Sequence, residues 1–244
     1  YPAAAPGKGT TYRSALPGEN GKDVTFSVAG IASPGARAAQ GKFPLVILAH
    51  GYSNTPVVLS WLGENLASKG YVVVAPDFRD PPITIRTAAA AAGPLSRRPL
   101  DIAFVAAEAQ RRARAGLGPF ATADADRTVL IGYSMGARIS VFATLSRPDR
   151  VRSLVLGGLG IGMTDGVGDW DPIADALLAP SLDEVTHARG RMFRAFAEQT
   201  KSDRIALADC IRGSRDLVAR SDMGKLDMPT LIGASDGVSV VRGP

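Results

Sequence analysis

The sequence has 244 residues, enough for one α/β domain with a sizeable core. Its 45% hydrophobic and 21% charged residues are typical of a globular protein, and no apolar run approaches the roughly 20 residues of a membrane span. The net charge of +5 is scattered. We interpret its tight cationic groups as solvated faces rather than a nucleic-acid patch: Arg97-Arg98, and Arg111, Arg112 and Arg114, which lie at the expected end of a helix. A single cysteine, Cys210, excludes an internal disulfide and a cysteine metal site.

The N-terminal stretch begins at Tyr1 and is rich in proline, alanine and glycine. It is compatible with the remainder of a cleaved export signal, which would imply a secreted or periplasmic protein, or with an arbitrary boundary. Val24, Phe26 and Val28 alternate with polar residues, which predicts a strand with one buried face. Residues 10–16 are expected to pair with this strand as a hairpin.

Two apolar runs follow. Residues 43–49 are nearly all apolar, which predicts a strand covered on both faces, and this strand leads into His50-Gly51-Tyr52. A helix is expected from about Pro56 to a stop at Gly70. Residues 71–77 predict a second buried strand, which ends at Asp77.

A long connection separates these elements from the centre of the chain. Residues 78–98 predict a loop with an alanine-rich patch, and Pro99 is expected to open a helix because proline suits a first helical turn. Residues 127–131 then predict a short buried strand, and residues 137–145 a helix. Between them lies Gly132-Tyr133-Ser134-Met135-Gly136.

This Gly-x-Ser-x-Gly motif between a strand and a helix is typical of a nucleophile elbow. The serine must sit on a sharp, strained turn so that its hydroxyl is exposed at the carboxyl end of the strand. A side chain at Gly132 or Gly136 would collide with a neighbouring strand or helix. The N-terminus of the following helix favours a developing negative charge. The alternative is a glycine-rich turn in which Ser134 only caps the helix.

The second half of the chain predicts one strand, a helical insertion and a final strand. Residues 151–158 form the first strand, and the amphipathic segments of residues 160–225 are interpreted as a helical cap inserted between strands. Residues 229–236 predict a strand that ends in Asp236. The backbone groups along the outer edge of this strand would be left unpaired. Alternating strands and helices predict an α/β fold with a mostly parallel central sheet and helices on both faces.

Ligands bind such sheets at the carboxyl ends of the strands. Five segments are predicted to reach these ends: His50-Gly51-Tyr52, Asp77, Ser134, Gly157-Gly158 and Asp236. Their convergence predicts a site at this edge of the sheet.

From about residue 10 to its end, the chain resembles the α/β-hydrolase superfamily. Residues 45–52, 66–77 and 98–102 resemble the dienelactone hydrolase and platelet-activating-factor acetylhydrolase-like branch, which includes bacterial polyesterases. From Arg147 onward the sequence is more similar to capped hydrolases that cleave small esters. The resemblance implies one α/β-hydrolase domain over residues 1–244, with residues 160–225 as its cap and with the final strand and helix of the fold missing.

The resemblance also implies roles for individual residues. Ser134 would be the nucleophile, and the backbone N–H groups of Tyr52 and Met135 would form the oxyanion hole. Asp236 would be the acid that orients a catalytic histidine, because the order in this fold is serine, acid, histidine. Asp236 could instead cap a turn, and three more carboxylates are candidates for the acid: Asp165, Asp169 and Asp171.

The catalytic histidine has no counterpart after Asp236, so no base is identified. The sequence has two histidines: His50 belongs to the oxyanion segment, where it would shape the loop, and His187 is expected to be a surface residue of the cap. Serine is a poor nucleophile without an adjacent base. We therefore expect that the chain is cut short, since one truncation would explain both the missing base and the missing final elements.

These features predict a serine hydrolase that cleaves small or moderately apolar carboxylic esters through an acyl-enzyme. The alternative is a non-catalytic ligand-binding member of the same fold, and a cofactor-free peroxidase or a carbon–carbon hydrolase is also compatible. No phosphate-binding loop or metal-ligand spacing is present, so no cofactor and no metal are expected. The expected partner is a small ester, without nucleic acid or a membrane span; the sequence leaves the oligomeric state open.

Overall fold

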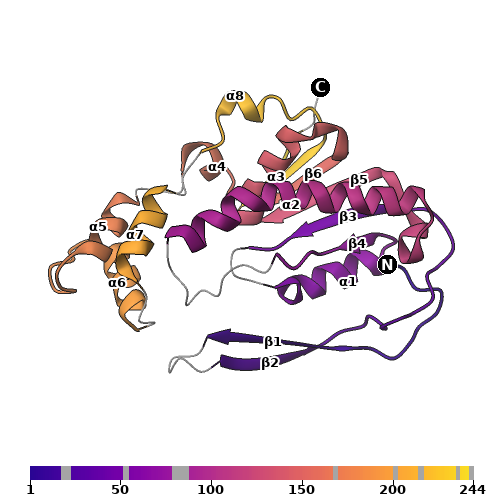
Figure 1. Cartoon of the computed structure of the whole chain (residues 1–244), viewed down its shortest axis with the longest axis horizontal. Coiled ribbons are helices and arrows are strands. Elements are labelled where there is room, and N and C mark those ends of the chain that lie inside the picture. The colour runs from indigo at the N-terminus through magenta and orange to yellow at the C-terminus, as the bar shows by residue number, and fades with distance from the viewer. Residues whose placement is uncertain are drawn as a thin grey trace.

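A central sheet of six strands organises the described part of the computed structural model (Figure 1). In spatial order the strands are β4 (Val72–Val74), β3 (Phe43–Ala49), β5 (Ala123–Tyr133), β6 (Ser153–Gly157), β7 (Thr230–Ala234) and β8 (Gly237–Val241). Neighbouring strands from β4 to β7 run parallel, and β8 pairs antiparallel with β7. The structure describes residues 1–17, 23–51, 55–78, 88–166, 170–199, 203–213, 217–234 and 237–241.

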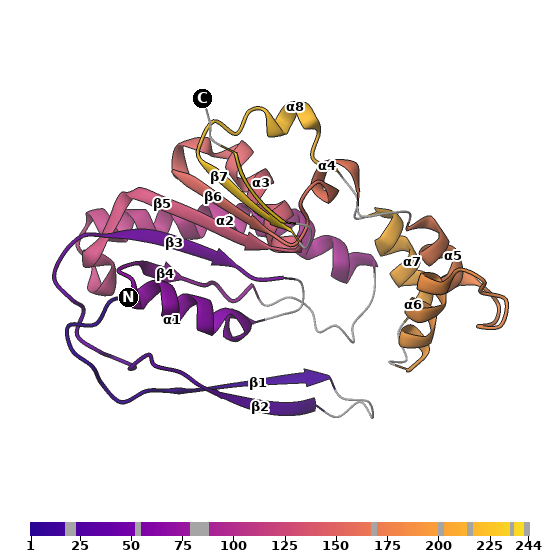
Figure 2. The same ribbon diagram turned by 180° about the vertical axis from the view of Figure 1, so that it is seen from behind.

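Helices cover the sheet on both faces, as the sequence predicts. The short 3-10 helix η1 (Pro56–Leu59) and α1 (Ser60–Ser68) lie on one face, and α2 (Ala88–Arg114) and α3 (Met135–Ser146) lie on the other (Figures 1 and 2). Two further 3-10 turns are η2 (Gly118–Thr122) and η3 (Pro148–Arg150). The α/β fold class is therefore confirmed.

The core lies mainly between the sheet and the α2–α3 layer. Leu130, Leu154 and Leu156 on the strands and Ile102 and Ile139 on the helices are each 1% exposed. The predicted strand at residues 43–49 is confirmed as β3, and its last five residues are at most 2% exposed because both faces of the strand are covered. This apolar burial is the main stabilising contribution to the fold.

Helix α2 begins about three turns earlier than the sequence predicts. We expected a loop up to residue 98 and a helix start at Pro99, but the helix runs from Ala88 and contains Pro94 and Pro99. The alanine-rich patch explains the difference, because alanine has the highest helix propensity and offsets the cost of the prolines.

The N-terminal hairpin is present and forms a sheet of its own. Strand β1 (Thr11–Pro17) pairs antiparallel with β2 (Asp23–Ala29), apart from the central sheet and on the α1 side (Figure 2). The expected buried face is wrong in part: Phe26 is half-buried, but Val24 and Val28 are 61% and 41% exposed. The face toward α1 is only partly covered, which leaves these valines accessible.

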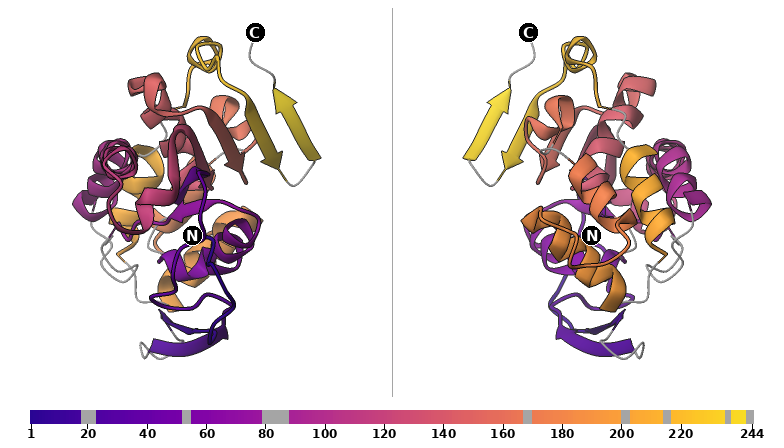
Figure 3. Two further views of the ribbon diagram at one scale, coloured as in Figure 1. Left: turned by 90° about the vertical axis from the view of Figure 1, so that its right-hand side faces the viewer. Right: turned by 90° about the vertical axis from the view of Figure 1, so that its left-hand side faces the viewer.

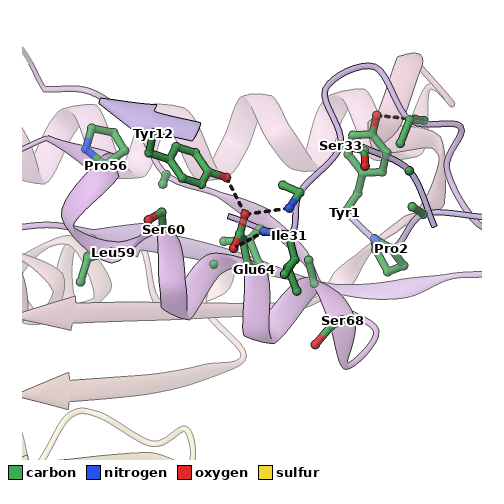
Figure 4. A pocket seen from close by; sticks show the side chains of 18 of the residues that line it. Tyr1, Pro2, Tyr12, Ile31, Ser33, Pro56, Leu59, Ser60, Glu64 and Ser68 are labelled. Carbon is green, nitrogen blue, oxygen red and sulfur yellow. Dashed lines mark hydrogen bonds between the residues drawn. The ribbon is translucent and has the colours of Figure 1, made fainter. Parts of the chain in front are cut away.

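One carboxylate joins the hairpin to α1. Glu64 accepts hydrogen bonds from the Tyr12 hydroxyl at 3.0 Å and from the backbone N–H groups of Ile31 and Ala32 at 3.0 and 2.8 Å (Figure 4). Burial raises the pKa of Glu64, but the bonds from Ala32, Ile31 and Tyr12 outweigh it and lower the pKa below 4.5. Burial and then the bond to Glu64 raise the pKa of Tyr12 from 10.0 to about 12.

A cavity of about 410 Å³ surrounds this contact. It lies between α1, the N-terminal segment and the sheet (Figure 4). Its lining includes Leu48, Val57 and Val73. The polar groups of Tyr12 and Glu64 in its wall are already bonded to each other. The cavity therefore offers mainly apolar surface.

The edge of β7 is paired. That the final strand and helix of the fold are missing stays a prediction, but we also expected the strand at residues 229–236 to leave its backbone groups exposed. Instead β8 pairs with β7 from Ala234↔Gly237 to Thr230↔Val241 (Figure 3). The sequence prediction missed this strand, which contains three valines, a β-branched residue type that favours strands.

Among the described residues between β6 and β7, five helices occur: α4 (Gly162–Asp165), α5 (Asp171–Leu178), α6 (Ala188–Gln199), α7 (Arg204–Gly213) and α8 (Arg220–Met223). Helices α5, α6 and α7 pack together beyond the carboxyl ends of the strands, and α7 contacts α2 (Figure 1). Their shared core is small and consists of Ala174, Leu177, Ala197 and Ala208.

In the part of the chain that the structure describes, no helix combines the length and the apolar character needed to cross a bilayer.

We predict that Glu64→Ala lowers the free energy of unfolding by about 1 kcal/mol for each hydrogen bond that it loses from Tyr12, Ile31 and Ala32. Because the folded pKa of Glu64 is depressed, its contribution is fully present above its unfolded pKa of 4.5 and is lost as the pH falls through the lower folded pKa. Urea unfolding at a series of acidic pH values measures both effects. Equal pH dependence in the variant and the wild type would contradict the prediction.

The contribution of Tyr12 to the free energy of unfolding depends on pH in the opposite direction. Because its pKa rises from 10.0 to about 12 in the folded state, the bond to Glu64 stabilises the fold below pH 10 and is lost as the pH rises through about 12. Tyr12→Phe should remove one tyrosine ionisation near pH 12 from an ultraviolet titration of the folded protein. An unchanged titration curve at that pH would contradict the prediction.

Candidate active site

The turn between β5 and α3 is strained at Ser134. This residue has φ 54° and ψ −122°, and it is the one non-glycine residue with positive φ in the described part of the chain. Such a conformation costs on the order of 1–3 kcal/mol and persists only where surrounding contacts enforce it. The strand, turn and helix that the motif predicts are all present, with β5 and α3 longer at both ends than the sequence indicates.

The two motif glycines permit this turn. A Cβ at Gly132 would collide with the carbonyl oxygen of Gly136 and lie 2.5 Å from the Ser140 hydroxyl, inside α3. A Cβ at Gly136 would collide with the carbonyl oxygen of Ala49 at the end of β3. The helix thus approaches both its own strand and the neighbouring strand more closely than any side chain allows.

Backbone hydrogen bonds hold the corner. The Ser134 N–H donates to the Gly157 carbonyl at 2.9 Å, and the Ser134 carbonyl accepts from the N–H of Ala137 at 2.9 Å. The exposed ring of Tyr133 lies against Gly157 and Gly158. A Cβ built at Gly158 would lie only 3.1 Å from this ring. These contacts leave Ser134 half-buried at the surface of the sheet edge.

The register of the sheet brings the predicted segments to one edge. Ala49 pairs with Gly132, and Gly157 lies between Tyr133 and Gly233. The residues that follow these positions, which include His50 and Ser134, therefore emerge side by side. Met135 opens α3, so its N–H has no acceptor within the helix and belongs to the positive end of the helix dipole.

The segment after β3 is held by a buried arginine from α2. Arg98 is 1% exposed and donates to the His50 carbonyl at 2.7 Å and to the Gly51 carbonyl at 3.2 Å. Its guanidinium carbon lies 4.3 Å from the centre of the Phe78 ring, which in turn lies 5.0 Å from the His50 ring. The interpretation of Arg98 as part of a solvated face is wrong, because two carbonyls and an aromatic ring replace its water. Arg111, Arg112 and Arg114 are exposed at the end of α2, as expected.

Comparison with known proteins places this strand–turn–helix arrangement in a family. A family model described as the alpha/beta hydrolase fold matches residues 44–190, more than half of the chain. The chain belongs to the α/β-hydrolase fold family. A search of the curated proteins finds no match.

Several solved structures are similar at low sequence identity. N-formylmaleamic acid deformylase from Pseudomonas putida S16 is 16% identical, with 92% of this chain and 77% of that chain covered and a TM-score of 0.40. A hydrolase from Pseudomonas aeruginosa PA01 is 18% identical, with 91% and 79% covered and a TM-score of 0.41. A hypothetical protein from Pseudomonas aeruginosa is 12% identical, with 95% and 78% covered and a TM-score of 0.48. We take no residue role from these similarities.

Two site residues that the sequence predicts for this α/β-hydrolase lie outside the described residues: Tyr52 and Asp236. Asp169, a further candidate for the acid, is also outside them. Asp165 is already engaged: it forms an ion pair with Arg220 at 2.5 Å, and the Thr164 hydroxyl and then Arg220 lower its pKa. Asp171 is exposed in the first turn of α5.

The two histidines have structural contacts. His50 is fully buried, and its Nδ1 lies 2.8 Å from the Gly51 carbonyl oxygen, so Nδ1 is the protonated nitrogen. His187 is exposed, and its Nδ1 accepts a hydrogen bond from the Gly190 N–H at 3.0 Å at the start of α6. Neither contact is that of a general base beside Ser134.

No group of three or more metal-binding side chains occurs among the residues that the structure describes. The cavity beside Glu64 is lined by residues of the α1 face and the N-terminal segment, and Ser134 is not among them. The site therefore consists of the elbow, the start of α3 and the segment after β3.

Sequence reasoning missed Arg98 and Phe78 as parts of this site. Arg98 stands beside Arg97, which is exposed, and nothing in residue type separates the two. The available signal was helical position: the apolar Ile102 lies four residues later on the same face of α2, and it is 1% exposed.

We predict that Gly136→Ala lowers the free energy of unfolding by about 1–3 kcal/mol, because the added methyl group overlaps the Ala49 carbonyl. Gly63→Ala in α1 is the control: the nearest atom to its Cβ would be Val73 Cγ1 at 3.9 Å, and alanine favours the helix by up to about 1 kcal/mol. Urea denaturation of both variants tests the difference. Equal free energies of unfolding for Gly136→Ala and Gly63→Ala would show that the fold does not require the close approach of Gly136 to the Ala49 carbonyl.

Proposed function

We propose that this α/β-hydrolase is a serine hydrolase that cleaves small or moderately apolar carboxylic esters. Ser134 would attack the ester carbonyl to form an acyl-enzyme, and water would release the acid. The observation that carries the proposal is the strained backbone of Ser134 at the carboxyl edge of the sheet. A turn that merely capped a helix would not need this strain, and the Ser134 side chain makes no capping hydrogen bond to α3.

The oxyanion hole would consist of two backbone N–H groups, those of Met135 and Tyr52. The position of Met135 at the start of α3 supports its part, since that N–H has no acceptor within the helix. The place of Tyr52 directly after the fixed Gly51 supports the other. The negative oxygen exists only in the transition state, and the loss of one such donor typically costs about 2.7–4 kcal/mol.

We propose Asp236 as the acid of the site because β7, which ends two residues earlier, is in register with the elbow strand through β6. The base remains unassigned. Removing one triad member leaves a residual acceleration of about 10³–10⁴-fold over water. Helices α4 to α8 would act as the cap of a single domain, since α5, α6 and α7 lie beyond the carboxyl ends of the strands (Figure 1).

Within the family, we propose the dienelactone hydrolase and platelet-activating-factor acetylhydrolase-like branch, which includes polyesterases. The segment after β3 and the residues around Arg98 support this placement, since they carry the sequence resemblance and lie together in the structure.

A non-catalytic ligand-binding role is the second candidate. The contacts of both histidines favour it, because His50 is engaged with Gly51 and His187 with the start of α6.

A covalent test distinguishes the two candidates. We predict that an activated phosphonate labels the protein at Ser134, as located by mass spectrometry of the peptides, and that Ser134→Ala is not labelled. Short-chain p-nitrophenyl esters should be hydrolysed by the wild type and not by the variant. A folded wild type that binds a non-hydrolysable ester analogue but is never labelled would establish the binding role instead.

A further inference from the structure

We propose that the cavity beside Glu64 is a binding site for a small, uncharged and mainly apolar molecule that carries one hydrogen-bonding group. This inference does not depend on the proposed function, because Ser134 is not among the lining residues and the cavity lies on the α1 face of the sheet, opposite to α3 (Figures 2 and 4). The volume of about 410 Å³ falls within the roughly 300–1,000 Å³ of small-molecule sites. Apolar cavities of about 150 Å³ already take up benzene.

The sheet provides an apolar floor for the cavity. Val46 pairs with Val73 in the parallel ladder between β3 and β4, and Leu48 follows two residues after Val46. Because side chains alternate across a strand, Leu48 and Val73 lie on the same face of the sheet, and both line the cavity. Their side chains have no polar atoms, so the burial of apolar ligand surface against them is favourable.

Helix α1 leaves this space open because two of its lining residues are small. Gly63 and Ala67 lie one turn apart on the helix, and both line the cavity. The nearest atom to a Cβ built at Gly63 would be Val73 Cγ1 at 3.9 Å, which is an ordinary van der Waals contact. A larger side chain at Gly63 would therefore enter the cavity without a collision at its first carbon.

The carboxylate of Glu64 disfavours anions in the cavity. Glu64 is the one charged side chain among the lining residues, all of which the structure describes. Burial opposes its ionisation, but hydrogen bonds from two backbone N–H groups and the Tyr12 hydroxyl hold the pKa of Glu64 below 4.5, so it is charged at neutral pH. The same three donors already compensate for its charge. The wall therefore favours an uncharged ligand over an anion and also over a cation.

Ser60 supplies the hydrogen-bonding group of the site. It lies four residues before Glu64 on the same face of α1 and lines the cavity (Figure 4). The hydroxyls of Tyr1 and Tyr12 donate to the Ala36 carbonyl at 2.6 Å and to Glu64 at 3.0 Å, whereas the Ser60 hydroxyl makes no hydrogen bond within the described part of the chain. A serine hydroxyl both donates and accepts, so it can pair with an oxygen or an N–H group of the ligand.

Two fluorescent probes with the same ring system test the class of ligand. N-phenyl-1-naphthylamine is uncharged and has one N–H group, and 8-anilino-1-naphthalenesulfonate adds a sulfonate to the same rings. We expect the amine to bind the wild type saturably, with one molecule per chain, and the sulfonate to bind about tenfold or more weakly. The net charge of +5 would by itself favour the sulfonate, so this order would report the local carboxylate. Equal or tighter binding of the sulfonate would contradict the assignment.

Variants on α1 test the place of binding. Gly63→Leu fills the cavity and should raise the Kd of N-phenyl-1-naphthylamine by about tenfold or more, and Ala67→Leu serves if that variant does not fold. Asn65→Leu is the matched control: Asn65 is exposed on the same helix and does not line the cavity, so the Kd should stay within about twofold. Ser60→Ala should raise the Kd about twofold to tenfold through the lost hydrogen bond. Glu64→Gln should narrow the difference between the two probes.

Amide hydrogen exchange then locates the bound probe. Saturating N-phenyl-1-naphthylamine should slow exchange in peptides of residues 56–68 and leave residues 135–146 unchanged, because a ligand stabilises the region that it contacts. Ser134→Ala should bind the probe as the wild type does, so the outcome is separate from that of the hydrolase proposal. Protection at α3 or at α5, α6 and α7 without protection at α1, or an unchanged Kd in folded Gly63→Leu, would overturn the inference.

Discussion

The close approach of α3 to the end of β3 is the constraint on which the site depends. Gly136 lies against the Ala49 carbonyl, where a side chain has no space. This contact brings the first N–H groups of α3 beside the segment that follows β3, and it forces the chain to turn sharply at Ser134. The strained backbone there is compensated by the bond from its N–H to Gly157 and by the first bonds of the helix.

Two arginines that are buried in the described part of the chain have backbone carbonyls as partners. Arg98 binds the segment after β3, and Arg194 binds the end of α5 and also forms an ion pair with Glu198 at 2.7 Å. A buried charge is costly unless it is hydrogen-bonded, and a carbonyl row offers several acceptors without a second charge. The hydrogen bonds to these carbonyls therefore offset the cost of burying each guanidinium.

Much of the fold could be predicted from the sequence because its signals are local. The apolar run of β3 directly predicts burial on both faces, and the glycines beside Ser134 directly predict a close approach of the backbone. The start of α2 could not be predicted in this way, since alanine propensity and two prolines oppose each other there. The burial of Arg98 depends on packing between distant segments, which residue type does not reveal. The roles of Ser134, Met135, Tyr52 and Asp236 stay predictions.

Helices α5, α6 and α7, which lie beyond the carboxyl edge of the sheet, bury little apolar surface among themselves. Their buried apolar core contains three alanines and one leucine, with Leu207 and Ile211 partly buried against it, so burial contributes less to these helices than to the sheet layer. Regions with little buried apolar surface open at a lower free energy than the rest of a protein. We therefore expect α5, α6 and α7 to separate from one another at a lower free energy than the strands of the sheet, while the corner at Ser134 keeps its shape.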